Sequence, residues 1–128
     1  MMVASLADPI IARIFGGVVI NCNDTFGPAS YDVHGLRFVF VPSAHDTATY
    51  ALDVESRDTE SPPFLVQHFE STNMPFFELW TRLEVIAKLL GYPVLELVKE
   101  SRRLNLHDED ISIRRVDTPT HWIAVGRL

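Results

Sequence analysis

The sequence is short of cysteine and of long hydrophobic runs, and each shortage excludes a class of protein. One cysteine, Cys22, cannot form a disulfide within the chain, which excludes a disulfide-stabilised scaffold and favours a reducing compartment. No window approaches the roughly 18 uninterrupted apolar residues that predict a transmembrane helix. We therefore expect no membrane partner and a cytoplasmic location.

Positive charge is also scarce. The chain carries 17 acidic against 11 basic residues, a formal net charge of -6. A field of that sign repels phosphate backbones and anionic membrane surfaces, so nucleic acid is not expected as a partner. A protein with a basic surface is the partner that this charge favours.

The sequence contains none of the short motifs that identify a catalytic or cofactor site. It has no glycine-rich phosphate loop, no HExxH metal motif and no GxSxG nucleophile elbow. Its five histidines, at positions 34, 45, 68, 107 and 121, are scattered singly. Cys22 lies in an apolar run, where a thiol is usually an inert part of the core. We therefore predict no catalytic residue, no metal ligand and no cofactor.

The first 22 residues are apolar and end in a cysteine, as a lipoprotein signal does. A basic start is missing, however, and Asp8, Pro9 and Arg13 interrupt the apolar run. We interpret the stretch as folded instead, because Asp8 can cap a helix, Pro9 suits its first position and Gly16-Gly17 ends it. The pattern predicts a short helix over 9–15, followed by a buried strand over 18–22.

Between residues 30 and 55 the hydrophobic period changes to two, which indicates half-buried antiparallel strands. In LRFVFV, residues 36–41, and in ATYALDV, residues 48–54, every second residue shares a face. The six residues 64–69, FLVQHF, follow two prolines and are rich in Phe and Val, so we predict another strand there. DISIRRV and THWIAVGRL, around residues 117–120, predict a terminal hairpin.

Two consecutive helices are predicted over 75–90 and 94–104. The apolar residues of the first recur at three- and four-residue spacing: Phe76, Leu79, Trp80, Leu83, Ile86 and Leu90. Gly91-Tyr92-Pro93 ends this helix and lets the second begin. Phe77, Val85 and Leu89 widen the apolar face beyond what one sheet contact requires, so a groove for a partner or an apolar ligand is an alternative use of this face.

Together these elements predict one fold. A chain of 128 residues makes a single domain, residues 1–128, and strands followed by helices favour the α+β class. We expect an antiparallel β-sheet, formed by a meander and the C-terminal hairpin, with the pair of consecutive helices packed on one face.

Two acidic stretches are the strongest candidates for a binding site. In NLHDEDISIRR, residues 105–115, a run of three carboxylates bridges a helix with a basic end and a strand: Asp108, Glu109 and Asp110. Asp58 and Glu60 belong to a second acidic stretch that begins at residue 53. Such patches steer and orient basic partners. We therefore expect a small acidic protein-binding module, such as an inhibitor, an immunity-type protein or an adaptor, that occupies a surface of its partner.

Two alternatives stay open. His45-Asp46 and His107-Asp108 would form a shared site if their loops lie at the same end of the sheet, because a carboxylate orients and charges an imidazole. The chain would then be a small enzyme or a ligand- or metal-binding protein. The other interpretation is a homo-oligomer whose interface is the wide apolar helix face or the terminal edge strand.

Overall fold

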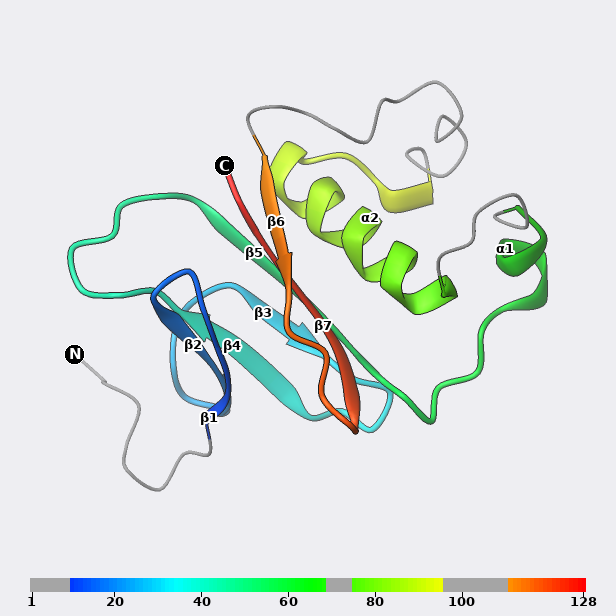
Figure 1. Cartoon of the computed structure of the whole chain (residues 1–128), viewed down its shortest axis with the longest axis horizontal. Coiled ribbons are helices and arrows are strands. Elements are labelled where there is room, and N and C mark those ends of the chain that lie inside the picture. The colour runs from blue at the N-terminus through cyan, green and yellow to red at the C-terminus, as the bar shows by residue number, and fades with distance from the viewer. Residues whose placement is uncertain (1–9, 69–74, 96–110) are drawn as a thin grey trace.

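The computed structural model describes residues 10–68, 75–95 and 111–128. In these residues seven strands form two antiparallel sheets, and two helices follow the fifth strand (Figure 1). The predicted α+β class with antiparallel pairing is confirmed. The strands are divided between two sheets, however, where a single sheet was expected.

The strand order is β1-β2-β4-β3 in the first sheet and β5-β7-β6 in the second. The first sheet comprises β1 (Ile10–Ile14), β2 (Gly17–Asn21), β3 (Ala29–Tyr31) and β4 (Arg37–Val41). The second comprises β5 (Tyr50–Ser56), β6 (Ser112–Arg115) and β7 (His121–Arg127). The helices are α1 (Pro63–His68) and α2 (Phe76–Leu90).

The two sheets pack face to face, and their inner side chains form the main core. Its fully buried members include Phe38, Phe40, Leu52, Ile123 and Val125. The other face of the second sheet is covered by α2, where Val85 packs against Ala51 and Ala124. The molecule thus has three layers, namely the first sheet, the second sheet and α2 (Figure 1).

The sheets meet along one side and stay apart along the other. On the closed side β3 lies next to β5, and the Ser30 hydroxyl accepts a hydrogen bond from the Val54 N–H at 3.0 Å. On the open side, β1 and β6 are the end strands of their sheets. A cavity of about 510 Å³, called here the seam cavity, is lined by residues of the β1–β2 hairpin and of β6.

Residues 10–14 form a strand, so the predicted helix over 9–15 is wrong. Phe15 and Gly16 have φ values of 53° and 72°, the positive values that a two-residue type I′ hairpin turn requires. The glycine pair therefore turns the chain back into β2 instead of ending a helix. The three isoleucines of β1 suit this strand, because β-branched side chains pack well on a pleated surface.

Residues 63–68 form helix α1, so the strand predicted over 64–69 is also wrong. Pro63 occupies the first helical position, where its missing N–H costs no hydrogen bond. The N–H groups of Leu65 and Val66 donate to Pro62 O at 3.1 and 3.0 Å. Leu65 packs against Leu79 of α2, and this tertiary contact favours the helix that six residues of sequence leave undecided.

The first long helix and the terminal hairpin are as predicted. α2 ends at Leu90 and is capped by Gly91, whose φ of 73° is left-handed and whose N–H donates to Ala87 O at 2.8 Å. β6 and β7 pair antiparallel. The chain is helical again at Val94 and Leu95, and the rest of the helix predicted over 94–104 lies outside the described residues. None of the described helices is long and apolar enough to cross a membrane.

Candidate functional site

Three segments that are far apart in the sequence enclose a cavity of about 320 Å³. They are the β3–β4 turn, the residues at the end of β5 and the residues that lead into β7. The lining residues are Asp32, His34, Leu36, Ser56, Arg57, Asp58, Pro119, Thr120 and His121. Two histidines and two aspartates are among them, and we call the cavity the histidine–aspartate pocket.

Asp32 is the buried carboxylate of the pocket, with a side chain that is 0% exposed. Its Oδ1 accepts hydrogen bonds from the N–H groups of His34 and Leu36, at 2.9 and 3.0 Å, and its Oδ2 lies 3.1 Å from His121 Nε2. Burial opposes ionisation of this carboxyl. The hydrogen bonds from His121, Leu36 and His34 outweigh burial, however, and hold the pKa of Asp32 below its ordinary value. Asp32 is therefore an anion whose charge is stabilised by the hydrogen bonds that its carboxylate accepts.

His121 connects Asp32 to a hydroxyl group. Its Nδ1 lies 2.9 Å from Thr120 Oγ1, and its ring packs on Phe38 with 4.9 Å between the ring centroids. Because an ionised Asp32 only accepts hydrogen bonds, it assigns the proton of the neutral imidazole to Nε2. Nδ1 is then the acceptor for the Thr120 O–H. Hydrogen bonds thus connect the Thr120 hydroxyl to the His121 imidazole, and the imidazole to the buried Asp32 carboxylate.

Asp58 and His34 form the exposed side of the pocket. Asp58 Oδ2 lies 2.9 Å from His34 Nε2, and the Ser56 hydroxyl donates to Asp58 Oδ1. The hydrogen bond from Ser56, followed by that from His34, lowers the pKa of Asp58. The Asp58 side chain is 65% exposed, so this anion is open to a binding partner.

Arg57 is the one arginine that lines the pocket. Its guanidinium lies 4.0 Å from the centroid of the Trp122 ring, and its Nε donates to Thr118 O at 2.6 Å. The carboxylates of Asp32 and Asp58 line the pocket together with this one guanidinium. Both carboxylates have lowered pKa values, so the pocket holds two anions at neutral pH.

Only two of the five binding residues predicted from the sequence, Asp58 and Glu60, lie within the described residues. Asp58 lines the histidine–aspartate pocket, whereas Glu60 is exposed and is not part of its lining. Asp108, Glu109 and Asp110 lie outside the described residues. Their role in binding stays a prediction.

The His45-Asp46 dipeptide is part of a turn. Asp46 accepts hydrogen bonds from the Ala48 N–H and the Tyr50 hydroxyl, which lower its pKa, the Tyr50 bond most. His45 is exposed and has a positive φ of 72°. His107 and Asp108 lie outside the described residues, so the predicted meeting of the two dipeptides stays untested.

The observed His–Asp pairs join residues that are distant in the sequence. His34 and Asp58 are 24 positions apart, and Asp32 and His121 are 89 apart. Sequence reasoning missed these pairs because it considered only adjacent histidines and aspartates. In residues 10–68, 75–95 and 111–128 no group of three His, Cys, Asp or Glu side chains could hold a metal ion.

A second group of ionisable side chains lies between β5 and α2. Asp53 and Glu55 of β5 and Glu84 of α2 interact electrostatically with Lys88, whose Nζ donates to Leu52 O at 2.7 Å. Asp53 Oδ1 lies 3.5 Å from Lys88 Nζ, and Asp53 Oδ2 has no hydrogen-bond partner in the described part of the chain. Burial, which outweighs the charge of Lys88, raises the pKa of Asp53 to about 8.

Comparison of the chain with protein-family models, with curated proteins and with solved structures finds no match. The site chemistry must therefore be interpreted from the chain's own residues.

Proposed function

We propose that the protein is a small acidic protein-binding module that takes a basic side chain of its partner into the histidine–aspartate pocket. An inhibitor, an immunity-type protein and an adaptor all act by occupying a partner surface in this way. The observation that carries the proposal is that two aspartates with lowered pKa values, Asp32 and Asp58, line one open cavity. Both are ionised at neutral pH, and a guanidinium or ammonium group of the partner pairs with the exposed Asp58 carboxylate, above the buried Asp32 anion.

The surroundings of the pocket also suit a protein partner. Val33 and Leu36, in the same turn as His34, are 60% and 44% exposed, and Leu36 lines the pocket. An apolar contact beside a charged one is typical of residues that dominate protein interfaces. Glu60, with the acidic run at 108–110, would steer a basic partner toward the pocket. We place this activity in the cytoplasm, where the thiol of Cys22 stays reduced.

Arginine derivatives test the pocket directly. We expect N-acetyl-arginine methylamide to cause saturable shifts in the amide NMR signals of His34, Thr120 and His121. The citrulline derivative has nearly the same shape without the charge, and we expect no saturable shift with it. Asp58→Asn should weaken arginine binding about tenfold, because one charge-assisted hydrogen bond is lost.

Glu78→Gln is the matched control, since it removes one carboxylate from the first turn of α2, outside the pocket lining. It should leave arginine binding within about twofold of the wild type. Equal shifts with arginine and citrulline, or equal affinity of the wild type and Asp58→Asn, would contradict the proposed function.

A second candidate function uses the same pocket for acyl transfer. The observation that favours it is the row formed by Thr120 Oγ1, the His121 imidazole and the buried Asp32 carboxylate. In such a row the hydroxyl is the nucleophile, the imidazole takes its proton and the carboxylate orients the imidazole. The chain would then be a small hydrolase of activated esters.

Hydrolysis of p-nitrophenyl acetate tests this second function. We expect Thr120→Val to lower the turnover rate at least tenfold, because the nucleophile is removed while the shape of the side chain is kept. Thr47→Val, which removes an exposed hydroxyl from the β4–β5 connection, is the control and should turn over as the wild type does. An unchanged rate in Thr120→Val would exclude the acyl-transfer role of this hydroxyl.

A further inference from the structure

The seam cavity lies between the end strands of the two sheets. Its lining residues come from the β1–β2 hairpin and from β6 with its next residue: Arg13, Ile14, Phe15, Gly16, Gly17, Arg114, Arg115 and Val116. Its volume, about 510 Å³, is that of a site for a small organic molecule. Three arginines are unexpected among so few residues in a chain of net charge -6.

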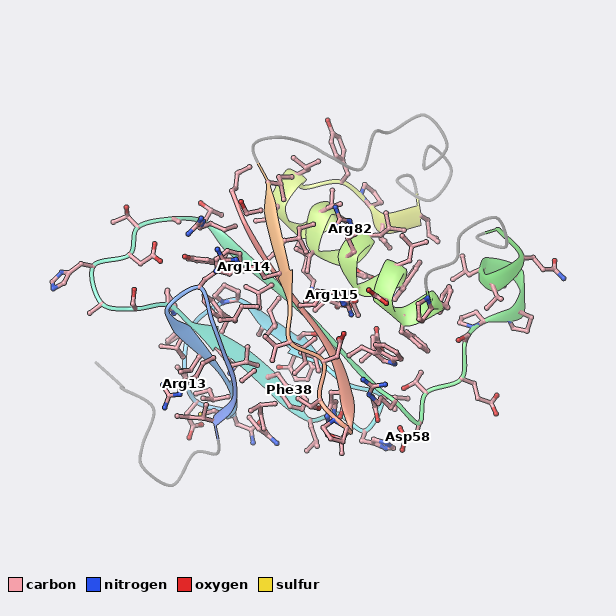
Figure 2. The ribbon with its side chains drawn as sticks, viewed as in Figure 1. Arg13, Phe38, Asp58, Arg82, Arg114 and Arg115 are labelled. Atoms are coloured by element: carbon pink, nitrogen blue, oxygen red, sulfur yellow. The ribbon has the colours of Figure 1, made fainter. Side chains whose placement is uncertain are left out.

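The charges of these arginines are only partly balanced. Arg115 pairs with Asp117, its Nη2 being 2.9 Å from Asp117 Oδ1, and its Nη1 donates to Glu78 O and Thr81 Oγ1. Within residues 10–68, 75–95 and 111–128, no carboxylate lies within 4.0 Å of a guanidinium nitrogen of Arg13 or Arg114. Arg114 therefore lacks an ion-pair partner in the described part of the chain. Arg13 is exposed between the core residues Ala12 and Ile14, so its side chain projects from the outer face of the first sheet, away from Arg114 (Figure 2).

Arg114 and Arg127 share one aromatic ring. Their Cζ atoms lie 4.5 and 4.8 Å from the centroid of the Phe15 ring, which is part of the cavity lining. Arg114 pairs with Val125, so Arg114 and Arg127 are diagonal neighbours on one face of the second sheet. Figure 2 shows Arg114 on the side of β6 toward the β1–β2 hairpin and Arg115 on the side toward α2. The backbone thus holds two guanidiniums beside one ring.

Phe15, which carries that ring, has an uncommon backbone conformation. Its φ of 53° is left-handed, where a bulky residue is an outlier and a turn of this type usually has Asn or Asp. The ring is nevertheless buried and also contacts Tyr50, with 5.7 Å between the centroids. Backbone strain of this kind gathers at binding sites.

We propose that the seam cavity binds a small organic phosphate, with Arg114 as the direct ligand of the phosphate group. Arg127, which also interacts with Asp46 and Tyr50, adds positive charge beside the Phe15 ring, and Phe15 and Val116 contact the organic part. A phosphate monoester carries a charge of about -1.5 to -2 and three acceptor oxygens, which suits the two guanidiniums beside the Phe15 ring, those of Arg114 and Arg127, better than a monocarboxylate does. This site is separate from the histidine–aspartate pocket and does not depend on the function proposed for it.

Phenyl phosphate is a suitable probe, and isothermal titration of the full chain measures its binding. We expect saturable binding of phenyl phosphate and at least tenfold weaker binding of benzoate, which has a single carboxylate. Arg114→Gln should weaken phenyl phosphate binding at least tenfold, because a charge-assisted bidentate contact is lost. Arg82→Gln removes one positive charge from α2 and should change the affinity less than twofold (Figure 2).

Three results would overturn the proposal. They are the absence of saturable binding by the wild type up to about 10 mM phenyl phosphate, an affinity for benzoate equal to that for phenyl phosphate, and unchanged binding by Arg114→Gln. Arg114→Lys keeps the charge without the forked geometry and serves as a second variant should Arg114→Gln fail to fold. Its affinity should be lower than those of the wild type and of Arg82→Gln, because the bidentate contact is lost. An affinity of Arg114→Lys equal to that of the wild type would also contradict the proposal.

Discussion

Replacing Asp53 with asparagine is expected to stabilise the protein by about 2–4 kcal/mol at pH 8 and to flatten the dependence of its stability on pH. Asp53 is only 5% exposed, and burial raises its pKa to about 8, whereas an aspartate in an unfolded chain has a pKa of about 3.9. Between these two values the folded state holds a proton that the unfolded state has released. The free energy of unfolding therefore falls as the pH rises through this window.

Glu55 adds to the same trend, because burial raises its pKa to about 7. Urea unfolding at pH 5 and at pH 8 measures both effects. The wild type should lose stability between the two values, and Asp53→Asn should lose much less. Glu60→Gln is the control, since this exposed carboxylate should leave the pH dependence unchanged. An Asp53→Asn variant with the wild-type pH dependence would show that Asp53 is ionised in the folded protein.

Asp32→Ala should have the opposite effect to Asp53→Asn and destabilise the protein by about 3–5 kcal/mol at pH 7. The Asp32 carboxylate accepts hydrogen bonds from two backbone N–H groups and lies next to His121 Nε2. Alanine has no acceptor atom, so all three nitrogen donors would lose their hydrogen bonds. Because the pKa of Asp32 is lowered in the folded state, its contribution is present above about pH 4 and is lost as the pH falls through the lowered value.

Thermal and urea unfolding at pH 7 check this second prediction. Asp32→Asn keeps the acceptor oxygen for the two backbone N–H groups and should cost about 1–2 kcal/mol. The exposed Asp24 provides the control, and Asp24→Ala should change the stability by less than about 0.5 kcal/mol. A loss below about 1 kcal/mol in Asp32→Ala would mean that the turn holds its shape without the carboxylate.

Long periodic segments of this chain are predictable from sequence, and short ones are not. The helix over 76–90 repeats its apolar spacing over four turns, so its pattern has enough length to favour one structure. Residues 10–14 and 63–68 are too short for a period to decide. Their structures depend on the turn at Phe15 and on the packing of Leu65 against Leu79, which are tertiary features.

The candidate site illustrates the same limit. A site made of adjacent histidines and aspartates was one of the alternatives that the sequence left open, but the pair at 45–46 forms a turn and the observed His–Asp pairs span 24 and 89 positions. Asp58 could be selected from sequence as an exposed carboxylate, since it stands in a polar, proline-bounded loop. Asp32 could not, because its importance comes from burial and from hydrogen bonds that only the folded β3–β4 turn provides.

β7 places one residue at each of the two cavities. His121, its first residue, contacts the histidine–aspartate pocket, and Arg127, its last, lies beside the Phe15 ring of the seam cavity. The two residues are an even number of positions apart, so both project from the same face of the strand. Inserting or deleting a single residue within β7 would turn one end to the opposite face. Both sites therefore depend on the number of residues in β7. Substitutions can change either site alone, whereas an insertion or deletion of one residue in β7 would disrupt one of them.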